Sequence, residues 1–252
     1  MRLALLQMTA VAGDAPGNLA QIEAAMGRAA AQGADLLLAP ELALGGYGAG
    51  DAMAELADPA QIKALSALAR THGIAVVAGL AERAGDTIYN AAVFTDGGAA
   101  TIYRKSHLYG DYERGLFQPG PPAAVTFLHR GITCGLLICY DVEFPENVRR
   151  LAQAGVDLVL VPTALPAGDH SPFIAGTIIP ARAFENQVFV AYANHCGADA
   201  RFAYAGLSHV AAPDGATLAQ AGAAPALLIV DIDPAAYGAS RADNPYLRDL
   251  RV

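Results

Sequence analysis

Apolar and polar residues are distributed along the first third of the chain in a pattern that predicts short buried strands separated by helices. The runs at 3–8 and 74–80 and the segment DLLLA at 35–39 are short and mostly apolar, as expected of strands inside a sheet. Between them, residues 18–32 and 59–70 have apolar positions at helical spacing, and each stretch is followed by a glycine stop signal. The pattern predicts consecutive βαβ units.

The middle of the chain changes to a hairpin pattern and then returns to strands and helices. Residues 87–94 and 99–104 flank an Asp-Gly-Gly turn, which is a strong local signal for a β-hairpin. We expect a loop over 106–122. Beyond that loop, the pattern predicts strands near Val125, at 132–138 and at 157–163, with a helix over 145–153.

Two distant segments resemble each other. AAAQGADLLLAPE at 29–41 and RLAQAGVDLVLVPT at 150–163 each contain a helix end, a glycine, an aspartate, an apolar strand and a proline. This similarity predicts two related halves. The remaining predicted elements are a helix at 174–186 and strands at 188–194, 207–212, 216–220 and 226–231.

The number of predicted strands, about a dozen, exceeds what one open sheet comfortably contains. We therefore expect an α/β fold in which two sheets lie face to face with helices outside. We expect residues 1–252 to form one domain, with 234–252 as a C-terminal tail of little periodicity.

Composition narrows the classes of partner. The chain has a formal net charge of -8 and a pI near 5.1, which argues against a nucleic-acid or anionic-membrane surface. No apolar run approaches the roughly 18 residues of a membrane span. Three cysteines without a Cys-x-x-Cys motif fit a reducing compartment, so we expect a cytoplasmic protein.

Cys139 is the first candidate for chemistry, because it follows the apolar strand at 132–138 and precedes a predicted helix start at Pro145. The carboxyl end of a strand is where an α/β protein binds ligands, and a nearby helix N-terminus would favour a thiolate. The sequence thus predicts a nucleophile. The alternative is a buried structural cysteine, which is the commoner role of a free cysteine and the one we expect for Cys134.

Glu41 and Lys105 follow two other predicted strands. Taken singly, Glu41 could cap a helix and Lys105 could be a surface lysine. Together with Cys139 they are polar residues that end three separate strands, which is how an α/β scaffold assembles a site from distant segments.

The sequence motifs of several other kinds of active site are absent from this chain. The chain has no His-Glu-x-x-His or Cys-x-x-Cys, and its histidines are scattered, so we expect no metal. It has no Gly-x-Ser-x-Gly, which disfavours a serine hydrolase. GGYGAG at 45–50 departs from the dinucleotide-binding pattern, and we interpret it as a flexible turn beside Glu41.

The motifs together resemble those of the nitrilase superfamily of carbon-nitrogen hydrolases, whose members have a Glu-Lys-Cys triad. The matching segments surround Glu41, Lys105 and Cys139 and include a fourth stretch near the last helix; they read APELALGGY, YRKSHLYGDYERGLFQPG, GLLICYDVEFPENVRRLAQAGVDLVLVPTA and ARAFENQVFVAYANHCG. Within the superfamily the chain is most similar to aliphatic amidases acting on amino-amides, the 5-aminovaleramidase and stereoselective amidase group.

The resemblance implies a four-layer αββα sandwich, with two mixed sheets flanked by helices. It implies a homodimer or higher homo-oligomer, with the segment at 174–184 as the first place to look for the interface. It implies a small-molecule amide as substrate and no metal, nucleotide or organic cofactor.

The resemblance also implies residue roles. Cys139 would attack the substrate carbon to form a thioester, and Glu41 would act as general base and acid. Lys105 and the backbone N–H of Tyr140 would stabilise the oxyanion, while Glu113 would hold Lys105 in place and help to position the substrate.

Five more residues lie near these motifs and could line the pocket. They are Tyr47, Tyr109, Glu143, Thr163 and Ala164. The Glu143 carboxylate could meet a substrate ammonium group, as an amino-amide would require. Alternatively, Glu143 could form an ion pair with Arg149 or Arg150.

The implied reaction is therefore amide hydrolysis with release of ammonia and a carboxylic acid, on small aliphatic or amino-acid amides. An N-carbamoyl hydrolase or a nitrilase would use the same triad, although nitrilases commonly have Trp-Glu after the nucleophile where this chain has Tyr140 and Asp141. A glutamine-fed synthetase would need an ATP-binding module, and we expect none to accompany this chain. A non-catalytic binding protein of the same fold would not need an intact triad.

Overall fold

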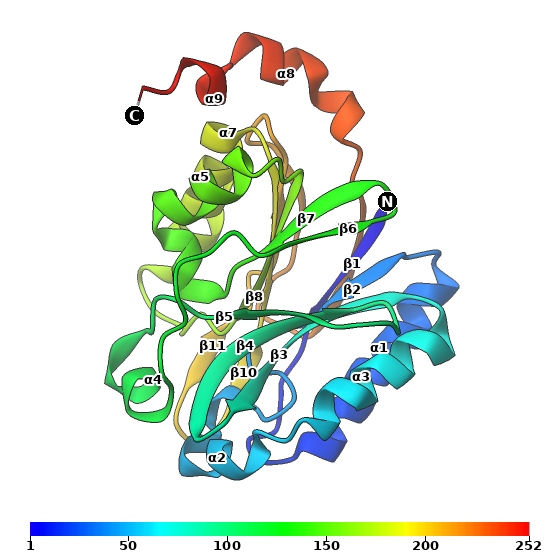
Figure 1. Ribbon diagram of the computed structural model, residues 1–252, viewed down its shortest axis with the longest axis vertical. Helices are drawn as coiled ribbons and strands as arrows, with labels where there is room; N and C mark the ends of the chain where they lie inside the picture. The colour runs from blue at the N-terminus through cyan, green and yellow to red at the C-terminus, as the bar shows by residue number, and fades with distance from the viewer. Residues whose placement is uncertain (252) are drawn as a thin grey trace.

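Two six-stranded sheets form the centre of the computed structural model, which describes residues 1–251 (Figure 1). In the first sheet, the strands follow the order β14-β1-β2-β3-β4-β5. Their bounds are β14 Ala226–Asp231, β1 Arg2–Gln7, β2 Leu36–Leu38, β3 Ala75–Ala84, β4 Thr87–Thr95 and β5 Thr101–Arg104. The β1-β2-β3 pairs are parallel and the outer pairs are antiparallel.

The second sheet repeats this arrangement. Its order is β6-β7-β8-β9-β12-β13, with parallel β7-β8-β9 pairs and antiparallel outer pairs. The bounds are β6 Thr126–His129, β7 Ile132–Leu136, β8 Leu158–Thr163, β9 Phe189–Asn194, β12 His209–Ala211 and β13 Thr217–Gln220. Strands β2 and β8 occupy equivalent places, so the two repeated sequence segments form the matching strands of the two sheets.

Helices cover the outer faces. In Figure 1, α1 (Ala15–Ala31) and α3 (Ala60–His72) lie together on one side, and α5 (Pro145–Gln153) and α7 (Ile179–Asn186) lie on the other. Side chains of β1 alternate accordingly, because Leu3 and Leu5 join the core between the sheets while Ala4 and Leu6 join the core beneath α1 and α3. Two mixed sheets flanked by helices confirm the predicted αββα sandwich.

Local chemistry sets where these helices begin and end. The Asp14 carboxylate accepts a hydrogen bond from the backbone N–H of Gly17 at 3.0 Å and so caps α1. Helix α3 ends at Gly73, whose φ of 68° is left-handed and is easily adopted by glycine. Helix α5 begins at Pro145, where the missing N–H has no helical partner to lose.

Two predicted elements need correction, and one observed element was not predicted. Residues 106–122 are not only a loop, since they contain α4 (Gly110–Leu116). The predicted helix at 174–186 consists of α6 (Ser171–Phe173), a π-helical turn η3 (Ile174–Ile178) and α7. A hairpin of β10 (Cys196–Ala198) and β11 (Ala203–Ala205) was not predicted. These elements are short, so periodicity gives little signal for them.

Short helices account for the rest. They are η1 Tyr47–Ala52, α2 Met53–Leu56, η2 Cys139–Glu143, η4 Pro234–Tyr237, α8 Gly238–Asp243 and α9 Tyr246–Asp249. The last three make up most of the predicted tail. Arg241 in α8 donates to the backbone oxygens of Gln187 and Pro234, which connects the tail to the end of α7. Among the helices of residues 1–251, none combines the length and apolar character that a bilayer span requires.

Gly79 allows the backbone around Glu41 to approach β3 closely. A Cβ atom at Gly79 would lie 2.2 Å from the Leu42 nitrogen and 2.6 Å from the Glu41 Cα. The Gly79 N–H donates to the Pro40 oxygen at 3.0 Å, and the Leu44 N–H donates to the Gly79 oxygen at 3.3 Å. A side chain at this position would therefore push against the segment that positions Glu41.

We expect Gly79→Ala to lower the free energy of unfolding by about 1–3 kcal/mol, as overpacking a dense core does. Chemical denaturation measures this change. Gly238→Ala is the matched control, because a Cβ at Gly238 meets no atom within 4 Å. Equal stability of the two variants would contradict the close-approach argument.

Candidate active site

Residues from four separate segments converge at one edge of the two sheets. Glu41 follows β2, Lys105 follows β5, Glu113 lies on α4 and Cys139 opens η2 after β7. The first three are fully buried, and Cys139 is 6% exposed. The structure thus brings together the residues that the sequence predicted as catalytic.

Lys105 lies between two carboxylates. Its Nζ donates to Glu41 Oε1 and to Glu113 Oε1, each at 2.7 Å. Burial alone would lower the pKa of Lys105, but the charges of Glu41 and Glu113 raise it well above its ordinary value. The ammonium is therefore charged, and two of its three N–H donors are used.

The two carboxylate oxygens of Glu41 differ in their hydrogen-bond partners. Oε1 accepts from Lys105 and from Asn90 Nδ2, the latter at 2.7 Å, while Oε2 has no hydrogen-bond partner among residues 1–251. Burial is the largest influence on the pKa of Glu41 and raises it, the Lys105 charge lowers it in part, and the balance is a pKa of about 7. A buried oxygen without a donor is ready to accept a proton.

Cys139 has a strained backbone and a neutral thiol. Its φ is 43°, in the left-handed region that non-glycine residues rarely adopt. Burial raises the pKa of the Cys139 thiol well above its ordinary value, and the Glu41 charge raises it further, with only partial compensation by Lys105. The expectation that a helix N-terminus favours a thiolate is therefore wrong, because burial and the adjacent carboxylate dominate.

Asp141 holds the strained turn in place. Its carboxylate accepts from the Tyr103 hydroxyl at 2.9 Å, the Ser106 hydroxyl at 2.8 Å and the backbone N–H groups of His107 and Ile138 at 2.9 and 3.2 Å. This buried carboxylate connects the Cys139 turn to the segment that follows Lys105. Asp141 thus has a structural use that occupies both of its oxygens.

Glu113 is supported from two sides. The Tyr47 hydroxyl donates to Glu113 Oε1 at 2.7 Å, and the backbone N–H of Tyr109 donates to Oε2 at 2.9 Å. Residues 45–48 are buried. The interpretation of 45–50 as a flexible turn is therefore wrong, since η1 packs inside the molecule and presents Tyr47 to Glu113.

The two sheets meet directly behind Glu41. The backbone oxygen of Thr163, at the end of β8, accepts from the N–H of Glu41 at 3.4 Å and of His195 at 3.3 Å. His195 Nε2 in turn contacts the Glu41 backbone oxygen at 2.7 Å. Burial lowers the pKa of His195, so the ring is neutral and its N–H can donate to that oxygen.

A cavity of about 360 Å³ opens beside the cysteine. Cys139, Tyr109, Tyr140 and Glu143 line one side. The rest of the lining is Leu165, Pro166, His170, Phe173, Ile174 and Ile178. Most of this wall is apolar, and Lys and Arg are absent from it.

The other predicted pocket residues lie behind this lining. Tyr47 supports Glu113, as described above. The Thr163 hydroxyl donates to the Val161 oxygen at 3.1 Å, so Thr163 presents its backbone rather than its side chain to the site. A backbone hydrogen bond from Ala164 partly offsets the rise in the pKa of the Cys139 thiol.

Glu143 makes no ion pair within residues 1–251. Arg149 donates to the Glu185 backbone oxygen, and Arg150 donates to Asn147 Oδ1, so the predicted alternative pairing is wrong. Arg182 binds the Glu143 backbone oxygen at 2.6 Å instead of its carboxylate. The carboxylate therefore remains free beside Cys139 in the cavity lining.

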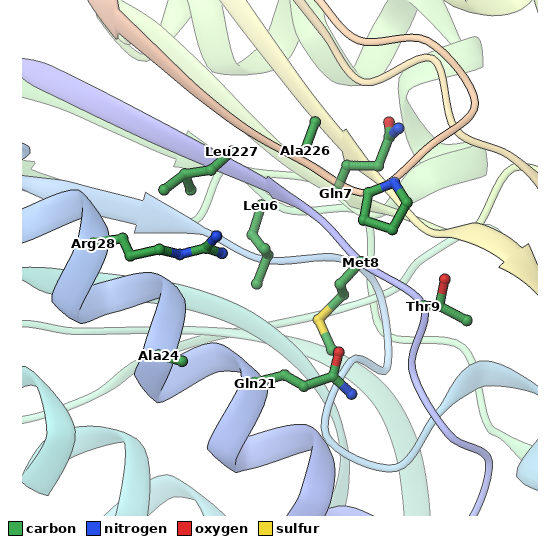
Figure 2. Close-up of a pocket in the computed structure, with 10 residues that line it drawn as sticks. Leu6, Gln7, Met8, Thr9, Gln21, Ala24, Arg28, Ala226 and Leu227 are labelled. Carbon is green, nitrogen blue, oxygen red and sulfur yellow. The ribbon is translucent and has the colours of Figure 1, made fainter.

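A second, larger cavity of about 610 Å³ lies elsewhere, between α1, β1 and β14 (Figure 2). Its lining includes Leu6, Met8, Gln21 and Leu227, with Arg28 as its charged residue, and it contains no acid or thiol. Within residues 1–251, no group of three or more His, Cys, Asp or Glu side chains is arranged to hold a metal ion. Of these two cavities, the one at Cys139 has both a nucleophile and an acid, Glu143, in its lining.

Sequence reasoning missed residues that support the site. Asn90 lies within β4, and Arg182 within α7, where each is a buried polar residue among apolar neighbours. His195 is one of the scattered histidines for which the sequence predicted no metal, and no supporting role was predicted for it. A polar residue inside an apolar run is the signal that could have identified Asn90, because a buried polar group needs a partner.

Known proteins match the chain over its whole length. Residues 2–242 match the carbon-nitrogen hydrolase family. All of the chain aligns, at 44% identity, with 89% of a Pseudomonas protegens protein named as a hydrolase in the pqqF 5' region. All of it also aligns, at 38% identity, with 92% of an (R)-stereoselective amidase from a Pseudomonas species.

A solved structure also matches the chain over its whole length. A mutant of the amidase from Nesterenkonia sp. AN1 superposes with a TM-score of 0.91 and 40% identity, covering 100% of this chain and 96% of that one. It shows the result of Michael addition of acrylamide at the active site cysteine. The chain therefore has the fold of an amidase whose mutant has an acrylamide adduct at its active site cysteine.

The pKa of Glu41 predicts how the reactivity of Cys139 depends on pH. If Glu41 takes the thiol proton, alkylation of Cys139 by acrylamide falls about tenfold per pH unit below pH 7, where Glu41 is protonated, and levels off above it. Mass spectrometry of the Cys139 peptide measures the rate. We expect Glu41→Gln to remove the inflection, whereas an unchanged profile in that variant would exclude Glu41 as the base.

Proposed function

The chain belongs to the carbon-nitrogen hydrolase family, as its resemblance to the nitrilase superfamily predicts, and we propose that it hydrolyses small aliphatic amides, including amino-substituted ones. The products are ammonia and a carboxylic acid, and the intermediate is a thioester on Cys139. The observation that carries this proposal is the free, buried Oε2 of Glu41, a residue whose charge raises the pKa of the Cys139 thiol.

This arrangement suits a thiol that needs a base at the moment of attack. A thiol with a raised pKa is a poor nucleophile unless its proton is removed. Glu41 has a pKa of about 7, near the pH at which a base is both ionised and able to bind a proton. Lys105 and Asn90 occupy Oε1, so the proton goes to Oε2.

In the first half of the reaction, Cys139 Sγ bonds to the amide carbon and Glu41 receives the thiol proton. The carbonyl oxygen becomes an oxyanion, which the third N–H of Lys105 and the backbone N–H of Tyr140 stabilise. Such a donor is often worth roughly 3 kcal/mol in the transition state. The C–N bond then breaks, and Glu41 returns the proton to the nitrogen that leaves as ammonia.

In the second half, a water molecule attacks the thioester carbon. Glu41 is again ionised and accepts a proton from the water, and the same donors stabilise the second oxyanion. The C–S bond breaks, the thiol regains its proton from Glu41, and the carboxylic acid leaves. Glu41 and Lys105 act in both halves of the reaction and are already buried and hydrogen-bonded to each other, so little rearrangement of these two side chains is required.

The cavity lining supports a substrate with a short carbon chain. Leu165, Ile174 and Ile178 provide apolar surface for it, and Glu143 provides a free carboxylate for an ammonium group. A substrate with its own carboxylate would meet the Glu143 carboxyl group, and the lining contains no Lys or Arg to pair with it. This observation favours an amino-amide over an N-carbamoyl amino acid.

Loss of the nucleophile should abolish turnover. We expect the native protein to release ammonia from short aliphatic or amino amides and Cys139→Ala to lose at least about a thousandfold in kcat, as removal of a nucleophile does. An ammonia assay over amides, N-carbamoyl compounds and nitriles measures this. Cys134→Ala, on β7, should leave kcat unchanged. Native-level turnover by Cys139→Ala would exclude the mechanism. If the native protein released ammonia only from nitriles or only from N-carbamoyl compounds, amides would not be its substrate class.

Glu143 should distinguish charged from neutral substrates. We expect Glu143→Gln to raise KM about tenfold for an ω-amino alkanamide, since a charge-assisted contact is lost. KM for the neutral alkanamide of equal length should stay within about twofold. Steady-state kinetics on the pair measures the difference. Glu146→Gln, exposed at the start of α5, is the control, and an equal change on both substrates would exclude ammonium recognition.

A further inference from the structure

The β10-β11 hairpin contains a carboxylate that is bonded to the backbone beside Tyr47. Asp199 Oδ1 accepts from the N–H groups of Arg201 and Phe202 at 2.7 and 2.9 Å, and Oδ2 accepts from the Tyr204 hydroxyl. The backbone N–H of Gly48 also donates to this carboxylate. Asp199 thus connects its own hairpin to η1, which lies about 150 residues earlier in the chain.

Gly48 permits this contact because it has no side chain. A Cβ at Gly48 would lie 2.2 Å from Asp199 Oδ2, so only a glycine lets the carboxylate reach the backbone N–H. Burial alone would raise the pKa of Asp199, but the hydrogen bonds from Tyr204, Arg201, Phe202 and Gly48 lower it on balance. The group at this contact is therefore an ionised acceptor.

The residue next to Gly48 is Tyr47, and the same hairpin packs on its ring. The Tyr47 ring lies 5.4 Å from that of Phe202 and 6.2 Å from that of Tyr204, both edge-on. The Tyr112 ring, on α4, also lies 5.5 Å from the Tyr47 ring, and the Tyr112 hydroxyl donates to the Tyr47 backbone oxygen at 2.6 Å. The ring is thus enclosed by hairpin residues and by α4, which limits the positions that its hydroxyl can take.

That hydroxyl donates to Glu113 Oε1, the same oxygen that binds Lys105 Nζ. Displacement of Tyr47 would remove one hydrogen-bond donor from Glu113 Oε1. The Lys105 ammonium, which binds the same oxygen, would then shift. The third N–H of Lys105 must point at the oxyanion, and small errors in such an arrangement strongly reduce rate.

We propose that Asp199 is a positioning residue for Lys105, acting through Gly48, Tyr47 and Glu113. The proposal rests on the function proposed above, because it assigns Lys105 to the oxyanion. Asp199 lies outside the cavity lining and does not contact substrate. Its effect is on kcat, since the oxyanion forms only after the substrate is bound.

A double-mutant cycle tests the proposal. We expect Asp199→Ala and Tyr47→Phe each to lower kcat about tenfold or more with KM within about twofold. The double variant should be no slower than the slower single variant within about twofold, because both changes interrupt one chain of contacts. Asp199→Asn, which keeps an acceptor for Arg201 and Phe202, should recover part of the lost kcat.

Several outcomes would overturn the proposal. The losses in kcat could multiply in the double variant, as they do for independent sites. Alternatively, Asp199→Ala could change KM alone or leave kcat intact. Asp214→Ala is the control, because Asp214 also accepts a backbone N–H in an exposed turn, from Ala216 at 3.0 Å, and should not alter kcat. If Asp199→Ala does not fold, Tyr204→Phe, which removes one donor to Asp199, takes its place in the cycle.

Hydrogen exchange separates this proposal from the proposed function. We expect Asp199→Ala to increase exchange in 46–50 and also in 109–113, where the Tyr109 N–H donates to Glu113. This readout does not need turnover. A native protein that hydrolyses no amide would refute the proposed function, whereas exchange confined to 196–205 would refute the positioning role alone.

Discussion

The Lys105 ammonium between Glu41 and Glu113 is the interaction on which the site depends. Three charges are removed from water together, and such a group is tolerated only where each member is paired and hydrogen-bonded. The pairing also divides the oxygens of Glu41, since Lys105 and Asn90 use Oε1 and leave Oε2 without a donor. The two carboxylates thus keep Lys105 charged, while burial, which the Lys105 charge offsets only in part, raises the pKa of Glu41 to about 7 and keeps the Cys139 thiol neutral.

The fold places Glu41 and the backbone oxygen that accepts from its N–H at equivalent places in two similar sheets. Strands β2 and β8 are the matching central strands, and each is followed or ended by a proline-containing segment. In the first sheet this segment contains Glu41, whose side chain enters the site. In the second it contains Thr163, whose backbone oxygen accepts from Glu41 and His195. One copy of the repeat thus provides a chemical group, and the other provides the hydrogen bond that holds it.

The strands and helices with clear periodicity were predictable, and the irregular segments that carry much of the site were not. Residues 145–153 were predicted as a helix with the observed bounds, because Pro145 marks the start and the apolar spacing is regular. Glu113 was expected in a loop, yet it lies on α4, which is too short to show a period. The hairpin of Asp199 was missed for the same reason. The segment at 45–50 was interpreted as flexible from its glycines, whereas those glycines allow close packing.

The sequence by itself predicted the layers of the fold and placed Glu41, Lys105 and Cys139 at the ends of strands, because strand periodicity and local motifs depend on residues close together in the chain. It could not decide the protonation of the thiol, the free oxygen of Glu41 or the free carboxylate of Glu143. These properties depend on burial and on partners such as Asn90 that are distant in sequence, so they arise only when the two sheets and their loops are packed together.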